Sequence, residues 1–309
     1  MKEIRERLSN EISKVVVGQQ HMVDAVLIAM TTGGHVLLEG APGTAKTLLA
    51  SIFARACGGA FRRVQCTPDL LPSDITGTLI LRGEELAFRP GPVFTNILLA
   101  DELNRTPPKT QAALLEAMQE NQVTVDGIPR PLPTPFIVIA TENPIEYEGT
   151  YPLPEAQLDR FMLKVRIDYP TAIEEIAMLH LARTGVSPAN IADIQPVISP
   201  DDILSLRQNI STVVAAEEVI SYIAAIVRRT RELPSVSLGA SPRAAVHLLA
   251  ASRAMAAMVG RSYVTPDDVA TLALPVLAHR IVLQPEAELE HFLPEDAIQA
   301  ALSSIVVPR

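Results

Sequence analysis

The sequence predicts an α/β domain built on a parallel sheet, followed by a smaller all-helical domain. Two observations predict this organisation: strand-length apolar runs alternate with helical patterns up to about Tyr169, and strand signals nearly vanish beyond Pro170. A chain of 309 residues is long enough for about two domains with separate cores. The expected boundaries are 1–169 for the α/β domain and 170–309 for the helical domain.

The α/β region begins with two amphipathic helical patterns and then alternates between strands and helices. The predicted helices are 4–17, 20–30, 46–57 and 107–120, and the predicted strands are 35–39, 61–66, 96–101, 136–141 and 162–168. In a parallel sheet of this kind, ligands bind at the carboxyl ends of the strands. Any polar residues that follow these strands are therefore candidates for a binding site.

Two stretches interrupt this alternation, and each has the pattern of a β-hairpin. Residues 67–94 contain two short alternating runs around a turn at Gly83, and residues 121–134 contain an Asp126-Gly127 turn signal. Both are expected as hairpin inserts in the α/β domain.

The second region is dominated by helical patterns. Helices are expected at 172–182, 200–208, 216–231, 242–258 and 266–280, with a connector at 184–199. Three of them begin with a capping hydroxyl before a proline, namely Ser199-Pro200, Ser241-Pro242 and Thr265-Pro266.

A glycine-rich segment follows the first predicted strand and leads into a helix. Strand, glycine-rich turn and helix start are the context in which backbone N–H groups converge on a polyphosphate. Lys46 would then reach the β- and γ-phosphates of ATP, and the Thr47 hydroxyl would complete the shell of a Mg²⁺ ion. Ala45 stands where a second glycine is usual. The predicted phosphate-binding residues are Gly40, Ala41, Pro42, Gly43, Thr44, Ala45, Lys46, Thr47 and Leu48.

The apolar run 96–100 ends in two adjacent carboxylates, Asp101 and Glu102. In P-loop ATPases, such an aspartate holds Mg²⁺ and a neighbouring glutamate polarises the attacking water. Because side chains alternate along a strand, the two should diverge and take different roles. The chain is therefore predicted to bind and hydrolyse ATP, with Thr47 and Asp101 as the metal-binding residues.

Composition excludes several other classes. The formal net charge of −9 argues against a broadly basic nucleic-acid-binding surface, and the absence of Trp leaves little for stacking on bases. Cys57 and Cys66 lack metal or redox spacing. The N-terminal residues lack a signal-peptide pattern, and no apolar run approaches the length of a membrane span. We expect a cytoplasmic protein without a membrane span.

Taken together, these motifs resemble the MoxR family of AAA+ ATPases over nearly the whole chain. The segments that carry the resemblance are Val16–Gln19, Gly40–Thr47, Asp101–Arg105, Pro107–Gln111, Leu114–Met118, Ala140–Pro144, Leu153–Phe161 and Gly239–Ala244. Alanine at position 45 is usual in this family. The resemblance implies a P-loop NTPase core of AAA+ type with the two hairpin inserts and a helical lid.

The resemblance also implies roles for further residues. Val17 and Gly18 would lie against the adenine, and Asn143 matches the first sensor beside the γ-phosphate. Arg160 matches an arginine finger inserted by a neighbouring subunit, and Arg243 matches the second sensor, acting in its own or the adjacent subunit's site. The alternatives are a surface ion pair with Asp159 for Arg160 and a salt bridge between lid and core for Arg243.

The function implied by the resemblance is that of a ring-forming ATPase, expected as a hexamer, which remodels or matures protein clients together with a von Willebrand factor A-domain partner. Two alternatives remain: a magnesium-chelatase-like or helicase-like motor, and a non-hydrolysing ATP-dependent assembly switch. A helicase would need basic pore hairpins, whereas Gln122–Ile128 carries only Asp126 as a charge. Intact Glu102, Asn143 and Arg160 argue against the switch.

Overall fold

The computed structural model describes residues 1–41, 46–144, 150–183 and 194–308. By packing, the chain forms two compact units. The sheet unit comprises residues 3–153 and 165–204, and the C-terminal unit comprises residues 1–2, 154–164 and 205–309. These names are used below for the two units, and each is described by itself.

The packing units differ from a single division at residue 170. Residues 154–164 pack with the C-terminal helices, because the Arg280 side chain donates hydrogen bonds to main-chain carbonyls in this segment. Residues 194–198 stay with the sheet unit, where Val197 N–H donates to the Ala56 carbonyl and Arg55 Nε to the Ile194 carbonyl. The boundary expected between the α/β domain and the helical domain, at residues 169 and 170, stays a prediction.

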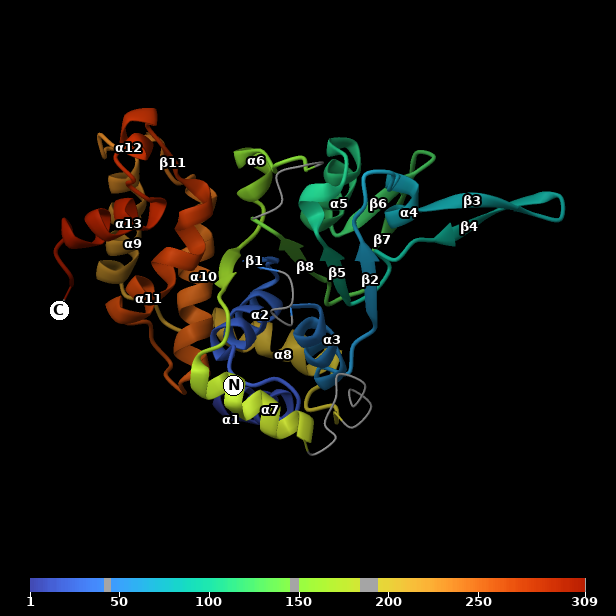
Figure 1. The fold of residues 1–309 in the computed structure, drawn as a ribbon, viewed down its shortest axis with the longest axis horizontal. Coiled ribbons are helices and arrows are strands. Elements are labelled where there is room, and N and C mark those ends of the chain that lie inside the picture. The colour runs from blue at the N-terminus through green and yellow to red at the C-terminus, as the bar shows by residue number, and fades with distance from the viewer. Residues whose placement is uncertain (42–45, 145–149, 184–193, 309) are drawn as a thin grey trace. The chain divides into compact units, whose positions relative to one another are not determined.

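The sheet unit is built on five strands in the order β2-β5-β8-β1-β9, and the pairs β2–β5, β5–β8 and β8–β1 are parallel (Figure 1). Up to β9, the chain contains α1 (Lys2–Ser13), α2 (Gln20–Thr32), β1 (Val36–Gly40), α3 (Lys46–Ala56), β2 (Phe61–Gln65), α4 (Pro72–Thr76), β3 (Gly77–Arg82), β4 (Glu85–Pro90), β5 (Ile97–Asp101), η1 (Leu103–Arg105), α5 (Pro108–Glu120), β6 (Gln122–Val125), β7 (Ile128–Pro131), β8 (Ile137–Glu142), α6 (Glu155–Leu158) and β9 (Leu163–Ile167). All the strands predicted for the α/β domain are present.

The central strands are buried from end to end, which explains their continuous apolar runs. All five residues of β5 and the first five of β8 are buried. Helix α2 packs on β1 and β8, and α3 packs on β2 and β5. Cys57 and Cys66 are buried, reduced members of this core.

Both predicted hairpins form. Strands β3 and β4 pair over their whole length, and the hairpin extends away from the sheet (Figure 1). In the hairpin β6–β7, Asp126 and Gly127 both have positive φ, which is the geometry of a tight type I′ turn. The hairpin extends to Pro131 and so includes Arg130, whose guanidinium lies 3.9 Å from the centre of the Phe88 ring.

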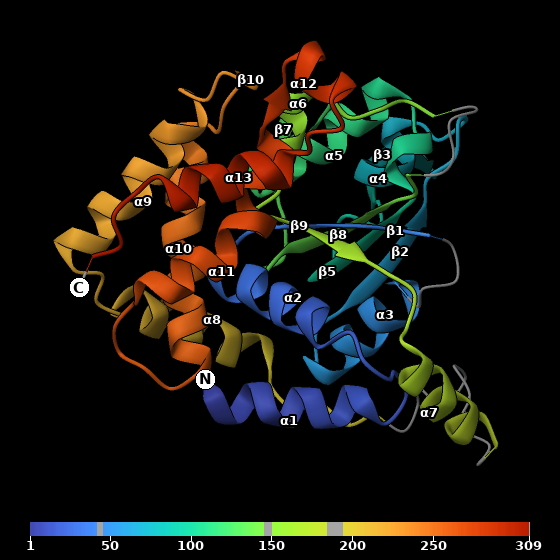
Figure 2. The ribbon, with the colours of Figure 1, turned by 60° about the vertical axis from the view of Figure 1, so that its left-hand side comes forward.

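The remaining elements are helical except for one short sheet. They are α7 (Ala172–Arg183), α8 (Pro200–Ser211), α9 (Glu217–Thr230), β10 (Val236–Leu238), α10 (Pro242–Met258), α11 (Pro266–Leu277), η3 (Ala278–Arg280), β11 (Val282–Leu283), α12 (Pro285–Leu289) and α13 (Pro294–Ser303). Helices α9, α10, α11 and α13 pack side by side in the C-terminal unit (Figures 1 and 2). Strands β10 and β11, an antiparallel pair, are too short to leave a periodic pattern in the sequence.

Local signals set several of these helix starts as predicted. The Ser241 hydroxyl accepts a hydrogen bond from the Ala244 N–H, and Thr265 forms a capping box with Asp268. The helix predicted over 266–280 ends at Leu277, two residues after Pro275, and continues as the 3₁₀ turn η3. Among the described helices, none has the length and apolarity needed to cross a membrane.

Candidate nucleotide site

The predicted phosphate-binding segment connects β1 to α3. Residues Pro42, Gly43, Thr44 and Ala45 lie outside the described residues. On one side, Gly40 ends β1, and on the other, Lys46, Thr47 and Leu48 begin α3. A Cβ atom at Gly40 would lie 2.6 Å from the Ile167 carbonyl oxygen, so β1 passes close to the end of β9 only because this residue is glycine. Strand β1 and helix α3 therefore lie on either side of this segment, in the predicted order.

The structure brings the two predicted metal-binding residues together. The Thr47 hydroxyl donates a hydrogen bond of 3.0 Å to Oδ2 of Asp101, although the residues are far apart in the sequence. Thr141, from the adjacent strand β8, donates to Oδ1 of the same carboxylate at 2.7 Å. The ends of β5 and β8 and the start of α3 thus form one polar cluster.

Lys46 is half-buried beside this cluster. Its Nζ donates to the carbonyl oxygen of Gly40 and lies 3.5 Å from the carbonyl oxygen of Glu142. Burial lowers the pKa of the Lys46 ammonium below its ordinary value, and the Asp101 and Glu102 carboxylates oppose that shift. The ammonium is therefore held among main-chain oxygens at the strand ends, where an anionic ligand would meet it.

Glu102 directly follows β5, which ends at Asp101, so the strand alternation expected from the sequence does not extend to it. Its φ of 60° and ψ of 51° place it in the left-handed region, which non-glycine residues rarely adopt and which is common at functional sites. Oε2 of its carboxylate accepts hydrogen bonds from Gln65 at 2.8 Å and from Arg105 at 3.1 Å. Its N–H donates to the Thr141 hydroxyl, which fixes the main chain at this turn.

The other sequence-predicted residues of the sheet unit are placed as follows. Asn143 directly follows β8, is 4% exposed and accepts a hydrogen bond from Asn104 through its main-chain carbonyl. Val17 is half-buried and Gly18 is exposed, with a φ of 74°, in the turn between α1 and α2. The left-handed backbone of Gly18 explains why a glycine stands there.

Sequence reasoning missed Arg63 on β2. Its Nε and Nη2 donate to Oδ2 of Asp101 at 3.1 and 2.7 Å. Burial of Asp101 opposes its ionisation, but hydrogen bonds from Thr141, Arg63 and Thr47 outweigh burial and hold the pKa of this carboxyl below its ordinary value. In the sequence, the pattern Arg63-Val64-Gln65 indicates that Arg63 and Gln65 lie on one face of a strand. That this face meets Asp101 follows only from the pairing of β2 with β5.

Arg160 and Arg243 both belong to the C-terminal unit. The Arg160 side chain has no ion-pair or hydrogen-bond partner among the described residues, so the alternative of a surface ion pair with Asp159 is not observed. Arg243 Nη1 lies 3.7 Å from Oδ2 of Asp159. Asp159 instead pairs with Arg243 and with Arg280, whose Nε lies 2.9 Å from Oδ1.

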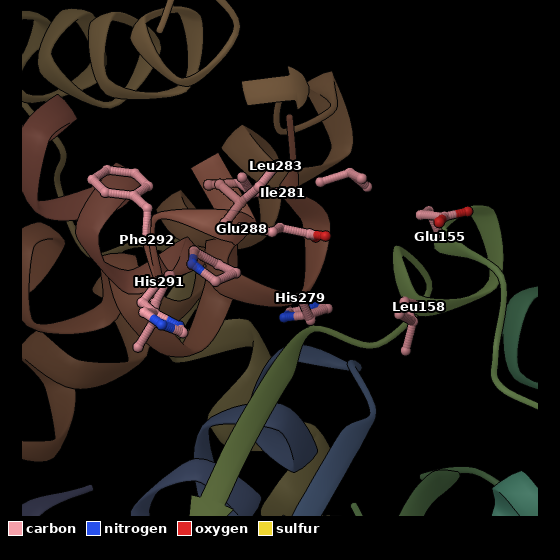
Figure 3. A pocket seen from close by; sticks show the side chains of 11 residues that line it. Glu155, Leu158, His279, Ile281, Leu283, Glu288, His291 and Phe292 are labelled. Atoms are coloured by element: carbon pink, nitrogen blue, oxygen red, sulfur yellow. The ribbon is translucent and has the colours of Figure 1, made fainter. Parts of the chain in front are cut away.

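The C-terminal unit also contains a pocket of about 430 Å³ (Figure 3). It is lined by Glu155, Leu158, His279, Ile281, Val282, Leu283, Glu288, His291, Phe292, Leu293 and Pro294. No residue of the predicted nucleotide site is among them. Despite the two histidines and two glutamates, no group of three or more His, Cys, Asp or Glu side chains suited to a metal ion occurs within the described ranges.

The parallel sheet, the acidic end of β5 beside α3 and the helical C-terminal region define the class of AAA+ ATPases. The family model described as "ATPase family associated with various cellular activities (AAA)" matches residues 35–163, and the AAA lid domain model matches residues 228–301. A model of the magnesium chelatase subunit ChlI matches residues 12–57.

Individual proteins that are similar to this chain over nearly its whole length identify its family. Chaperone MoxR1 of Mycobacterium tuberculosis is 43% identical over 98% of this chain and 82% of its own length. Protein YeaC of Bacillus subtilis is 47% identical over 96% of this chain and 92% of its own length. The crystal structure of a protein assigned as an ATPase, from Cytophaga hutchinsonii, superposes with a TM-score of 0.91 at 41% identity, covering 99% of this chain and 96% of that one. The chain belongs to the MoxR family of AAA+ ATPases.

Proposed function

We propose that this ATPase hydrolyses ATP with Mg²⁺ at the carboxyl ends of β1, β5 and β8. The observation that carries the proposal is the 3.0 Å hydrogen bond between Thr47 and Asp101, because P-loop NTPases hold Mg²⁺ with a hydroxyl of the phosphate-binding loop and an aspartate at a strand end. Thr47 and Asp101 would hold the ion, which neutralises phosphate charge when bound. Lys46 would bind the β- and γ-phosphates, and Glu102 would polarise the attacking water.

Asn143 would orient the water from the end of β8, and Val17 and Gly18 would contact the adenine. Arg243, at the start of α10, is proposed as the second sensor. The Arg243 side chain is 43% exposed despite its contact with Asp159, so a phosphate can approach it. The arrangement of subunits in the ring determines whether Arg243 contacts the nucleotide of its own subunit or that of the adjacent one.

The proposed assembly is a ring, with a hexamer as its expected form. Phosphoryl transfer spreads negative charge over the γ-phosphate oxygens, and an arginine supplied across a subunit interface stabilises this charge. Arg160 is a candidate for that role because its guanidinium has no polar partner among the described residues. A head-to-tail interface, repeated around a closed ring, would give every nucleotide site such an arginine.

We further propose that the ring remodels or matures protein clients together with a von Willebrand factor A-domain partner. The family membership and the chaperone name of a relative support this proposal. The match of residues 12–57 to a magnesium chelatase subunit favours a chelatase-like motor as the second candidate. A helicase-like motor is less well supported, because Arg130 on the hairpin β6–β7 is stacked over Phe88.

Mixing two inactive variants tests the ring. Neither Lys46→Ala nor Arg160→Ala subunits should hydrolyse ATP alone, but a mixture should regain activity. In mixed rings of equal composition, about one interface in four joins an intact nucleotide site to an intact Arg160. We expect up to about a quarter of wild-type ATPase activity.

The control replaces Arg166, an exposed arginine of β9, with alanine. This variant should keep its activity without mixing. If mixed rings form by native mass spectrometry and no composition restores hydrolysis, Arg160 does not act across the interface.

Replacing Arg63 with glutamine is expected to increase the effect of Mg²⁺ on nucleotide affinity. Arg63 lies 2.7 Å from the Asp101 oxygen proposed to bind the ion, so the two cations compete for one carboxylate. Because the arginine is 48% exposed, the contact is worth only ~1 kcal/mol, or about fivefold in affinity. The measurement is the ratio of the dissociation constants of ATPγS in EDTA and in Mg²⁺.

Arg62→Gln is the matched control, because Arg62 precedes Arg63 on the same strand and its side chain points to the opposite face. It should leave the ratio unchanged. Equal ratios for wild type and both variants would show that Arg63 does not compete with the ion.

A further inference from the structure

The main chain around Arg160 is held by a buried arginine of the same unit. Arg280 lies in η3, directly after α11, and is 4% exposed. Its Nη2 lies 2.6 Å from the carbonyl oxygen of Phe161 and 3.2 Å from that of Asp159. These two carbonyls flank Arg160 on either side.

Nδ1 of His247 also lies 2.6 Å from Arg280 Nη2. The two hydrogens of this nitrogen are therefore shared among three acceptors, which are the His247 ring and the carbonyls of Phe161 and Asp159. The longer contact with the Asp159 carbonyl is therefore the weaker one. The Asp159 carboxylate adds an ion pair to this weak hydrogen bond. Its Oδ1 lies 2.9 Å from Arg280 Nε, although the two atoms are not aligned for a hydrogen bond. Arg280 Nη1 donates to the Val276 carbonyl at 2.7 Å, which ties the guanidinium to α11.

His279 adds a second contact to the same segment. Its Nε2 lies 3.1 Å from the Phe161 carbonyl oxygen, which can only accept, so the ring donates from Nε2. Burial and the adjacent Arg280 charge lower the pKa of His279 well below its ordinary value, so the ring is neutral. Both contacts of this carbonyl thus come from η3.

A buried arginine is costly unless it is paired and hydrogen-bonded. Burial lowers the pKa of Arg280 to about 10, so the guanidinium stays charged at neutral pH. Its Nε faces the Asp159 carboxylate and its Nη2 donates to the carbonyls on both sides of Arg160. The Arg160 side chain itself has no polar partner among the described residues. The direction of Arg160 is therefore determined by its main chain.

We propose that Arg280 is a positioning residue, whose guanidinium fixes the main chain on both sides of Arg160 and so aims this arginine at the nucleotide of the adjacent subunit. The proposal rests on the proposed function, in which Arg160 acts across a ring interface. Asp159 extends the arrangement to α10, because its Oδ1 also accepts from the Ser241 hydroxyl at 2.8 Å and its Oδ2 faces Arg243. Arg280 and Arg243 therefore meet at one carboxylate, that of the residue directly before Arg160.

The test places Arg280→Lys in one or the other partner of the mixing experiment. Lysine keeps the charge but lacks the planar fork that spans several acceptors. In the first mixture, the variant is in the Lys46→Ala subunit, which supplies Arg160. In the second, it is in the Arg160→Ala subunit, which supplies only the nucleotide site.

We expect the restored ATPase activity to fall about tenfold in the first mixture and to change less than about twofold in the second, because only in the first does the subunit with the Arg280 substitution also carry Arg160. A merely structural role would lower both mixtures equally. Equal losses, or no loss in either, would overturn the positioning role while leaving the ring proposal standing. Failure of the parent mixture to regain activity would overturn both.

Arg261→Lys is the matched control, because Arg261 forms another arginine–carboxylate pair, with Asp268, in the same unit. It should affect both mixtures alike. If Arg280→Lys subunits do not enter mixed rings, Arg280→Gln, which buries no charge, is placed in the same two positions and must show the same asymmetry.

Discussion

Replacing Glu102 with glutamine is expected to leave ATP bound but unhydrolysed, with a turnover number lower by roughly 10²- to 10⁴-fold, the range typical of a lost general base. Glutamine keeps the size of the side chain, and its carbonyl oxygen can still accept from Gln65 and Arg105. What it lacks is the negative charge that draws the proton from water. Single-turnover hydrolysis and ATP dissociation constants, measured on the same preparation, separate the two effects.

Glu116→Gln provides the control, because Glu116 is an exposed carboxylate of α5. It should hydrolyse ATP at the wild-type rate. Turnover by Glu102→Gln within about threefold of wild type would assign the polarising role to another residue. A large loss of ATP affinity would instead show that Glu102 holds the nucleotide.

Replacing Lys46 with alanine is expected to weaken ATP binding by roughly a hundredfold or more. Two charge-assisted hydrogen bonds to phosphate oxygens are together worth ~3 kcal/mol, which corresponds to that factor. The fold should survive, because Lys46 is only half-buried and its contacts are with main-chain carbonyls at the strand ends. Isothermal calorimetry measures the affinity, and the melting temperature without nucleotide reports on the fold.

Lys109→Ala is the matched control, since Lys109 is an exposed lysine at the start of α5. It should bind ATP as the wild type does. An affinity of Lys46→Ala within about twofold of wild type would show that the phosphates bind elsewhere.

Much of the architecture could be predicted because its signals are local. The continuous apolar runs of β5 and β8 reflect burial on both faces, and the Asp126-Gly127 turn and the Ser241 cap follow from the conformations that these residues adopt. The separate roles expected for Asp101 and Glu102 stay a prediction, and the strand alternation on which it was based does not reach Glu102, because β5 ends at Asp101.

Partners brought together by the fold could not be predicted in this way. Arg63 meets Asp101 because β2 pairs with β5, and nothing in the local sequence specifies that neighbour. The short strands β10 and β11 and the turn η3 fall below the length at which periodicity becomes visible.

The sequence by itself determined the class of this protein, because a phosphate-binding segment after one strand and an acidic pair after another are local patterns with a defined chemistry. Only the tertiary structure decided which groups hold these residues in place. Arg280 is the last residue of the helix expected over 266–280, and only the fold shows that it is buried against the carbonyls that flank Arg160. The physical reason is that a buried charge needs polar partners, and packing supplies two of them from the Asp159 and Phe161 carbonyls, which lie more than a hundred residues away in the chain.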